Sequence, residues 1–373
     1  MNDTTLHVLV VDDSAVVRHT VGRLLQPSDG WRLTTAPDPV VALDRMRGQA
    51  PDVILLDLEM PRMDGLTFLR HVMATEPIPV VICSGYAAHG TRLALAALEA
   101  GAVEIFPKPR LGVKAFLEGA GPSLTSVLRA AAAAGPSLKR RWRSRLDAEP
   151  WFQSGAGRSP GPAPSTRVGN VGSAGATVLL GASMGGPEAL RRILSEFPAN
   201  GPACVVVQHM PEHFTAAFAS RLDRMVPMEV REAGDGDPVV PGRVLIARGG
   251  RHLVVEGGKA GTHVRLVEGA PVQGHIPSVD VLFESAASVL GSSAVAAVLT
   301  GMGNDGAAGL HALAEAGAQT LVQDEASCTV FGMPGAALEK GGAQRLVPLP
   351  QIGRRLLELA GVGPTAAPGH GAA

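Results

Sequence analysis

Residues 177–187 read TVLLGASMGGP, and the rest of the chain can be interpreted from them. A short apolar run changes abruptly to small residues, and Pro187 then opens a segment with helical spacing, which predicts a strand, a sharp turn and a helix. Ser183 stands at the apex of that turn. The pattern is typical of a nucleophile elbow, which lifts a serine hydroxyl above the carboxyl end of a sheet. A glycine- and serine-rich turn with no catalytic role has the same composition. Other segments of the chain must therefore decide whether Ser183 is a nucleophile.

The composition is that of a folded protein with two or three domains. Of the 373 residues, 46% are hydrophobic and 18% are charged, which is enough for packed cores. The net charge of −1 gives no general attraction to nucleic acids or membranes. The three cysteines are widely separated, which argues against a disulfide framework and suits a reducing cytosol. No apolar run approaches the ~20 residues of a membrane span, so we expect a cytoplasmic protein without membrane insertion.

Residues 1–109 predict a first α/β domain. Buried apolar runs alternate with segments of helical spacing, which indicates a doubly wound parallel sheet. The strand-like runs are 6–11, 53–56, 80–83 and 103–106. In such sheets the functional residues gather at the carboxyl ends of the strands. The residues found there are Asp12, Asp13, Asp57, Ser84 and Lys108.

Three carboxylates at one sheet edge repel one another strongly. At ~4 Å and an effective dielectric constant near 20, each pair costs roughly 4 kcal/mol. A hard divalent cation relieves this repulsion, and carboxylate oxygens suit Mg²⁺. A helix N-cap is the simpler role for a polar residue after a strand, and we expect that role for Ser14.

These residues resemble a response-regulator receiver domain, which has a flavodoxin-like fold. The resemblance rests on VVDDS at 10–14, DLEMPRMDG at 57–65 and Lys108-Pro109. It implies that Asp57 accepts a phosphoryl group from a histidine kinase. It also implies that Mg²⁺ is held by Asp12, Asp13, Asp57 and the Glu59 carbonyl. Lys108 would contact the phosphate, and Ser84 and Phe106 would be the switch residues. We expect the fluorescence of Trp31 to respond to Mg²⁺.

Residues 110–172 predict a flexible linker. Strand-like runs vanish, and alanine-rich and then Pro/Gly/Ser-rich segments appear, with one helix possible at 121–134. The segment carries ten Lys or Arg residues against three acids, including the cluster 139–145 around Trp142. Such a cluster can contact nucleic acid or an acidic protein surface, but a solvated tether is the more common outcome.

Residues 173–360 predict a second, Rossmann-like α/β domain, followed by a disordered tail at 361–373. The strand-like runs are 178–180, 204–207, 244–247, 295–299 and 320–322. Ser183, His209 and Asp305 each stand just beyond the carboxyl end of one of these runs, so a parallel sheet brings them into one crevice. This is the arrangement that a Ser-His-Asp relay needs.

A dinucleotide site is the rival interpretation of the loop at 301–306. Its sequence GMGNDG fits G-x-G-x-x-G after a strand, and Asp324 could serve as the ribose acid. We discount this site because the fingerprint belongs at the first strand of its domain. The chain order Ser, His, Asp also differs from that of ordinary α/β-hydrolases.

The second domain resembles the chemotaxis protein-glutamate methylesterases, the CheB family. The matching segments are 181–187, 208–211, 277–283, 299–306 and 325–334. The resemblance implies a serine hydrolase that releases methanol from glutamyl γ-methyl esters of chemoreceptors, with glutamine deamidation as a related activity and no cofactor for the esterase chemistry. It implies that Ser183 is the nucleophile, His209 the base, Asp305 its orienting acid and the Met302 amide the oxyanion donor.

Two departures and one alternative remain. The family commonly has His-Arg-Pro where this chain has His275-Ile276-Pro277. It commonly has Ala-Pro-Gly where this chain has Ala247-Arg248-Gly249. Both departures affect how the receptor is bound.

The expected protein is a phosphorylation-activated methylesterase. The alternative is a response regulator that acts by binding nucleic acid or protein through its basic linker, with a relict hydrolase domain, but no helix-turn-helix pattern follows the receiver.

Overall fold

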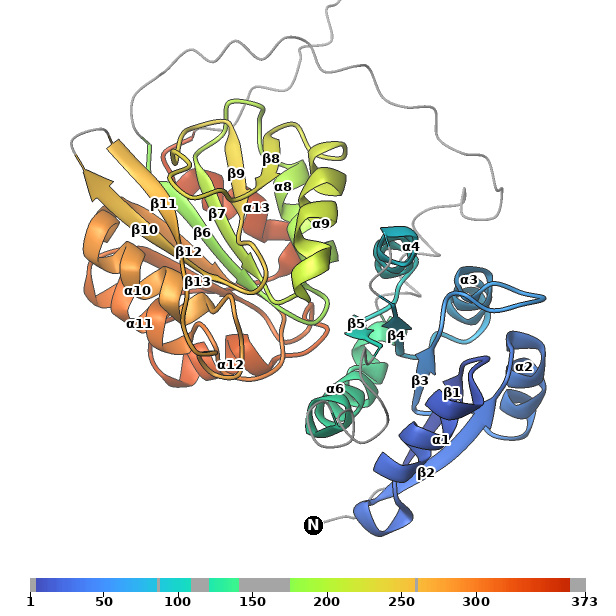
Figure 1. Cartoon of the computed structure of the whole chain (residues 1–373). Coiled ribbons are helices and arrows are strands. Elements are labelled where there is room, and N and C mark those ends of the chain that lie inside the picture. Colours follow the sequence, from blue (N-terminus) through green and yellow to red (C-terminus); the bar gives the residue numbers. More distant parts are fainter. Residues whose placement is uncertain (1–4, 86–87, 109–120, 141–174, 259–260, 363–373) are drawn as a thin grey trace, which may run out of the picture. The chain divides into compact units, whose positions relative to one another are not determined.

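The computed structural model describes residues 5–85, 88–108, 121–140, 175–258 and 261–362. They form two compact units, which are described separately (Figure 1). None of the helices within these ranges is long and apolar enough to cross a membrane.

The first unit contains a five-stranded parallel sheet in the order β2-β1-β3-β4-β5. Its strands are β1 (Leu6–Val11), β2 (Trp31–Ala36), β3 (Val53–Leu56), β4 (Val80–Ser84) and β5 (Glu104–Pro107). The helices of this unit are α1 (Ala15–Leu24), α2 (Pro39–Gly48), α3 (Gly65–Thr75), α4 (Ala88–Glu99) and α6 (Gly121–Ala133). The central strand β3 is buried along its whole length, as its continuous apolar run predicts.

Side-chain caps decide where three of these helices begin. The Ser14 hydroxyl accepts a hydrogen bond from the Val17 amide at the start of α1, which confirms the predicted cap. Asp38 caps α2, and Asp64 caps α3. Each cap lies close behind a strand, so the chain turns sharply at the carboxyl edge of the sheet.

Helix α6 packs against the first sheet although its residues lie in the segment predicted as linker. It contacts β1, β3, β4 and β5, and Leu124 and Leu128 on it are buried. The Arg129 guanidinium lies over the Trp31 ring, 4.3 Å from its centroid, and donates a hydrogen bond of 2.7 Å to the Asp29 carbonyl. The predicted helix at 121–134 is therefore present, and it covers an apolar face of the first unit. Most of the basic cluster lies outside the described residues.

The second unit contains a seven-stranded parallel sheet in the order β14-β13-β12-β6-β7-β9-β8. Its strands are β6 (Thr177–Ala182), β7 (Cys204–Gln208), β8 (Glu229–Glu232), β9 (Arg243–Ile246), β12 (Ala294–Val298), β13 (Gln319–Gln323) and β14 (Leu346–Val347). Strands β10 (His252–Gly258) and β11 (Gly261–Val267) form a separate antiparallel hairpin, which the sequence analysis did not anticipate. All five strands predicted from apolar runs are present.

Helices cover both faces of this sheet (Figure 1). Helices α10 (Val279–Leu290), α11 (Ala307–Glu315) and α12 (Gly332–Glu339) share one core with the sheet and the hairpin. On the other side lie α8 (Gly186–Ser195), α9 (Thr215–Asp223) and α13 (Leu349–Leu359). The sheet and its two helical layers confirm the predicted doubly wound α/β architecture.

Two glycines allow α10 to approach the central strands closely. A Cβ atom on Gly181, in β6, would lie 2.3 Å from Cγ1 of Val279, and one on Gly306 would lie 2.7 Å from the same atom. Gly306 also has a φ of +91°, which disfavours other residues. The first turn of α10 is thereby held at the carboxyl edge of the sheet, beside the residues predicted to carry the chemistry.

Candidate functional site

The strand register brings Ser183 and His209 to neighbouring positions. Ala182 pairs with Gln208 across β6 and β7, and the His209 amide donates to the Ala182 carbonyl at 2.9 Å. On the other side, the Ser183 amide donates to the Thr300 carbonyl at 3.0 Å. Ser183 therefore sits at the carboxyl end of the central strand, between the strand that precedes His209 and the strand that leads to Asp305.

The imidazole of His209 is held by Asp305. Its Nε2 lies 2.7 Å from Oδ2 of Asp305, and the two residues are 8% and 1% exposed. Among the described residues, Nδ1 of His209 is buried and has no hydrogen-bond partner. The carboxylate thus fixes one ring nitrogen and leaves the other available to accept a proton.

The carboxylate of Asp305 binds the N-terminus of α10. Its oxygens accept hydrogen bonds from the Ser278 hydroxyl at 2.8 Å and from the amides of Val279 and Asp280 at 2.8 and 2.9 Å. Burial alone would raise the pKa of Asp305, but the hydrogen bond from His209 and those from the helix amides outweigh it, so the pKa is lowered. The carboxylate is therefore ionised at neutral pH.

Two further side chains belong to this site and were not predicted to act there. The Gln208 amide nitrogen donates to the carbonyls of both Ser183 and His209 at 2.9 Å. The ring of His275 stacks on that of His209, with centroids 3.7 Å apart and planes inclined by 7°. Gln208 could have been suspected from its position before His209, whereas no spacing rule connects His275 with it.

The loop that carries Met302 is packed tightly against the serine. A Cβ on Gly301 would lie 2.3 Å from Sδ of Met333 and 2.8 Å from Cβ of Ser183. The Gly301 carbonyl also accepts hydrogen bonds from the amides of Gly332 and Met333, at 3.0 and 2.9 Å. Met302 is the next residue, so its backbone lies close to Ser183.

The acidic residues of the first unit also come together as predicted. Carboxylate oxygens of Asp12, Asp13 and Asp57 lie within 4.8 Å of one another. The Lys108 ammonium is 2.7 Å from Oδ2 of Asp57 and 3.1 Å from Oδ2 of Asp12. Burial raises the pKa of Asp12, against the lowering effect of Lys108. One lysine leaves this cluster with excess negative charge on hard oxygen donors, which is typical of a Mg²⁺ site.

The remaining receiver residues border the same edge. Ser84 is buried at the end of β4, and its carbonyl accepts a hydrogen bond of 2.8 Å from the Lys108 amide. Phe106 is buried in β5 opposite Cys83. Trp31 is different, because it pairs with Leu6 at the start of β1, about 20 Å along the strand from the acidic end. A response of its fluorescence to Mg²⁺ would therefore have to be transmitted along the sheet, and it stays a prediction.

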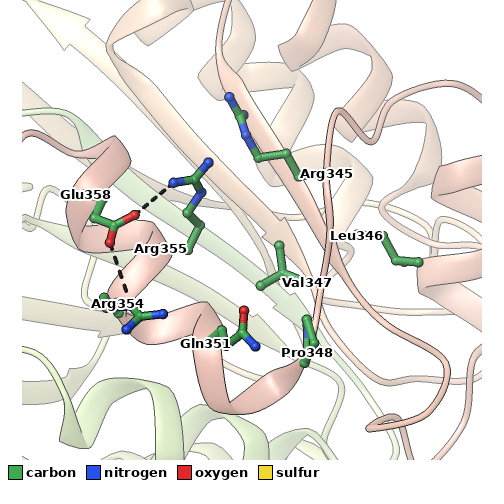
Figure 2. A pocket seen from close by; sticks show the side chains of 8 residues that line it. All are labelled: Arg345, Leu346, Val347, Pro348, Gln351, Arg354, Arg355 and Glu358. Carbon is green, nitrogen blue, oxygen red and sulfur yellow. Dashed lines mark hydrogen bonds and ion pairs between the residues drawn. The ribbon is translucent and has the colours of Figure 1, made fainter.

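A groove at the outer edge of the second sheet is separate from these residues (Figure 2). It has a volume of about 320 Å³ and lies between β14 and α13. Its lining residues are Arg345, Leu346, Val347, Pro348, Gln351, Arg354, Arg355 and Glu358. Glu358 pairs with Arg355 at 2.8 Å and with Arg354 at 3.7 Å, and Arg345 donates to the Gln319 side chain at 3.0 Å. The groove contains none of the residues predicted to carry chemistry.

Comparisons with known proteins match both units. A family model described as CheB methylesterase matches residues 178–356, and one described as response regulator receiver domain matches residues 8–114. The protein-glutamate methylesterase/protein-glutamine glutaminase 1 of Anaeromyxobacter dehalogenans is 51% identical over 352 residues, covering 94% of this chain and 98% of that protein. The chain belongs to the CheB family.

A second relative gives the same result, and one solved structure is similar in part. Protein-glutamate methylesterase/protein-glutamine glutaminase 3 of Geobacter metallireducens is 46% identical over 95% of this chain and 99% of that protein. The crystal structure of the Thermotoga maritima CheB catalytic domain has 38% identity and a TM-score of 0.49, covering 50% of this chain and 100% of that one. The family, the receiver domain and the enzyme class predicted from the sequence are confirmed, while the roles of individual residues remain predictions.

The ring geometry predicts which nitrogen of His209 carries the proton. The ionised Asp305 accepts at Nε2, so we expect the proton of the neutral imidazole to lie on Nε2 rather than on Nδ1. Nitrogen-15 NMR of the full-length protein labelled at histidine tests this, with the His209→Gln variant used to assign the signal. In Asp305→Asn the preference should be lost. A wild-type His209 protonated at Nδ1 alone would contradict the arrangement.

Proposed function

We propose that this protein hydrolyses glutamyl γ-methyl esters of chemoreceptors and deamidates receptor glutamines. The observation that carries the proposal is the site in which Ser183 neighbours His209, whose Nε2 is bound by Asp305 and whose Nδ1 is unpaired. Relatives named protein-glutamate methylesterase/protein-glutamine glutaminase, matched along almost the whole chain, support it.

In the first half of the reaction, Oγ of Ser183 attacks the ester carbonyl carbon. Nδ1 of His209 takes the serine proton, and Asp305 stabilises the imidazolium that results. The carbonyl oxygen becomes an oxyanion, and the Met302 amide is placed to donate to it. When the tetrahedral intermediate collapses, the bond to the methoxy oxygen breaks, and the imidazolium gives its proton to the departing methanol.

In the second half, water hydrolyses the glutamyl-serine ester. Nδ1 of His209 takes a proton from the water, the hydroxide attacks the acyl carbon, and Ser183 leaves with that proton. The product is a glutamate side chain. A glutamine substrate follows the same two steps but releases ammonia in place of methanol. All of these steps use side chains and backbone amides, so the esterase chemistry needs no cofactor.

Removing the nucleophile tests this mechanism. Ser183→Ala should lower methanol release from methyl-labelled receptor by on the order of 10³-fold or more, because Oγ forms the covalent intermediate. His209→Ala should fall by a similar factor. The double variant should be little slower than either one, because both residues serve one step. A near-wild-type rate in either single variant would rule out the relay.

For the first unit, we propose that a histidine kinase phosphorylates Asp57. The acidic cluster and its lysine support this assignment. Mg²⁺, held by Asp12, Asp13, Asp57 and the Glu59 carbonyl, would neutralise charge on the incoming phosphoryl group. Lys108 would contact the phosphate. Ser84 and Phe106 would rearrange as switch residues.

Asp57→Asn should abolish phosphorylation, and excess EDTA should stop it in the wild-type protein, because three carboxylates repel a phosphoryl donor without a cation. Transfer of ³²P from a kinase measures both effects. Asp44→Asn is the matched control, since Asp44 is an exposed acid on α2. Labelling that persists in Asp57→Asn would place the phosphoacceptor elsewhere, and undiminished labelling in EDTA would rule out the need for a cation.

We further propose that phosphorylation activates the esterase. Supporting this, the second unit carries its own serine, histidine, aspartate and oxyanion loop, which leaves the receiver a restraining role.

We place the receiver at residues 1–109 together with α6, a linker at about 141–172, and the catalytic domain at 173–360. The burial of all three cysteines as thiols and the kinase phosphodonor support a cytoplasmic location.

A fragment of residues 173–373 tests the restraint. It should hydrolyse receptor methyl esters faster than the unphosphorylated full-length protein, because the receiver is absent. It should also ignore phosphodonors, to which the full-length protein responds. Circular dichroism serves as the control for folding. A folded fragment that is slower than the resting full-length protein would show that the receiver assembles the site instead.

A further inference from the structure

His275 lies against His209, the base of the proposed relay. Within the described part of the chain, no hydrogen bond joins it to Ser183 or Asp305. A tight turn holds it, in which the amides and carbonyls of Val272 and His275 exchange hydrogen bonds of 2.9 and 3.0 Å. Gln273 and Gly274 form the turn with φ values of +50° and +81°. The backbone of His275 is therefore fixed by the turn, and its imidazole stacks flat on that of His209, with centroids 3.7 Å apart.

The ring of His275 is uncharged at neutral pH. Burial lowers its pKa, the nearby His209 lowers it further, and Asp305 opposes them only in part, which brings the pKa to about 4. A second positive charge in contact with the base would oppose protonation of His209. A neutral ring has no such effect.

We propose that His275 is a positioning residue for His209: its ring fixes the plane of the base and offers a neutral aromatic face to the imidazolium formed during catalysis. The proposal rests on the relay described above. Nothing in the hydrolysis requires a proton from His275, so its contribution is geometric and electrostatic.

The need for such a residue follows from how His209 is held. Asp305 grips one ring nitrogen, Nε2, and a single hydrogen bond leaves the ring free to turn about that axis. Stacking on the ring face restricts this rotation and so fixes the direction in which Nδ1 points. An aromatic face also carries negative electrostatic potential, which attracts a cation placed over it.

The proposal predicts that aromatic character at position 275 matters more than the histidine itself. In the full-length protein with phosphodonor, His275→Leu should lower kcat about 10-fold while KM changes less than about 2-fold. His275→Phe should stay within about 3-fold of wild type, with His275→Tyr as the second aromatic variant if Phe does not fold. His263→Leu, at a half-exposed position of β11, is the control for loss of a histidine.

A second measurement does not depend on the esterase reaction. The Nε2–H signal of His209 should remain in the His275→Phe spectrum and broaden or vanish in His275→Leu, because the unstacked ring moves and exchanges its proton with water. This readout separates failure of the proposed function, in which no variant releases methanol, from failure of the stacking role. Normal kcat and a normal His209 signal in a folded His275→Leu would overturn the inference. So would aromatic variants that fold but match His275→Leu.

Discussion

The buried carboxylate of Asp305 is the point at which the catalytic domain is held together. It accepts hydrogen bonds from His209, from the Ser278 hydroxyl and from two amides at the start of α10. A buried ion without such partners would cost several kcal/mol. Because these donors come from β7 and α10 while the acid follows β12, one side chain fixes three segments that are distant in the sequence. The orientation of the His209 ring and the position of the first turn of α10 therefore both depend on Asp305.

Both units apply the same topological rule to different chemistry. Parallel strands bring the residues that follow them to one edge, whether these are a phosphoacceptor cluster or a hydrolytic relay. The balance of charge differs between the two edges. In the receiver, three acids face one lysine and call for a cation. In the second unit, the Asp305 carboxylate is matched by hydrogen-bond donors from the protein.

Sequence reasoning located the strand-end residues because their position depends only on where an apolar run stops. Ser183, His209 and Asp305 are of this kind, and the structure brings them together. His275 reaches the site from a turn, and its contact with His209 depends on tertiary packing that no local pattern records. The hairpin β10–β11 was missed because its strands are mixed in polarity. The place of α6 was missed because an alanine-rich helix indicates nothing about its partner.

The packing of α6 has a practical consequence for dividing this protein into parts. Leu124 and Leu128 cover strands β1, β3, β4 and β5, and Arg129 covers Trp31. A receiver cut after residue 109 would expose this apolar face to water, and exposed faces of that kind promote association between molecules. Any aggregation or dimerisation seen with so short a piece would reflect the missing helix and would carry no information about signalling. A receiver intended for study on its own should therefore retain the chain through residue 140.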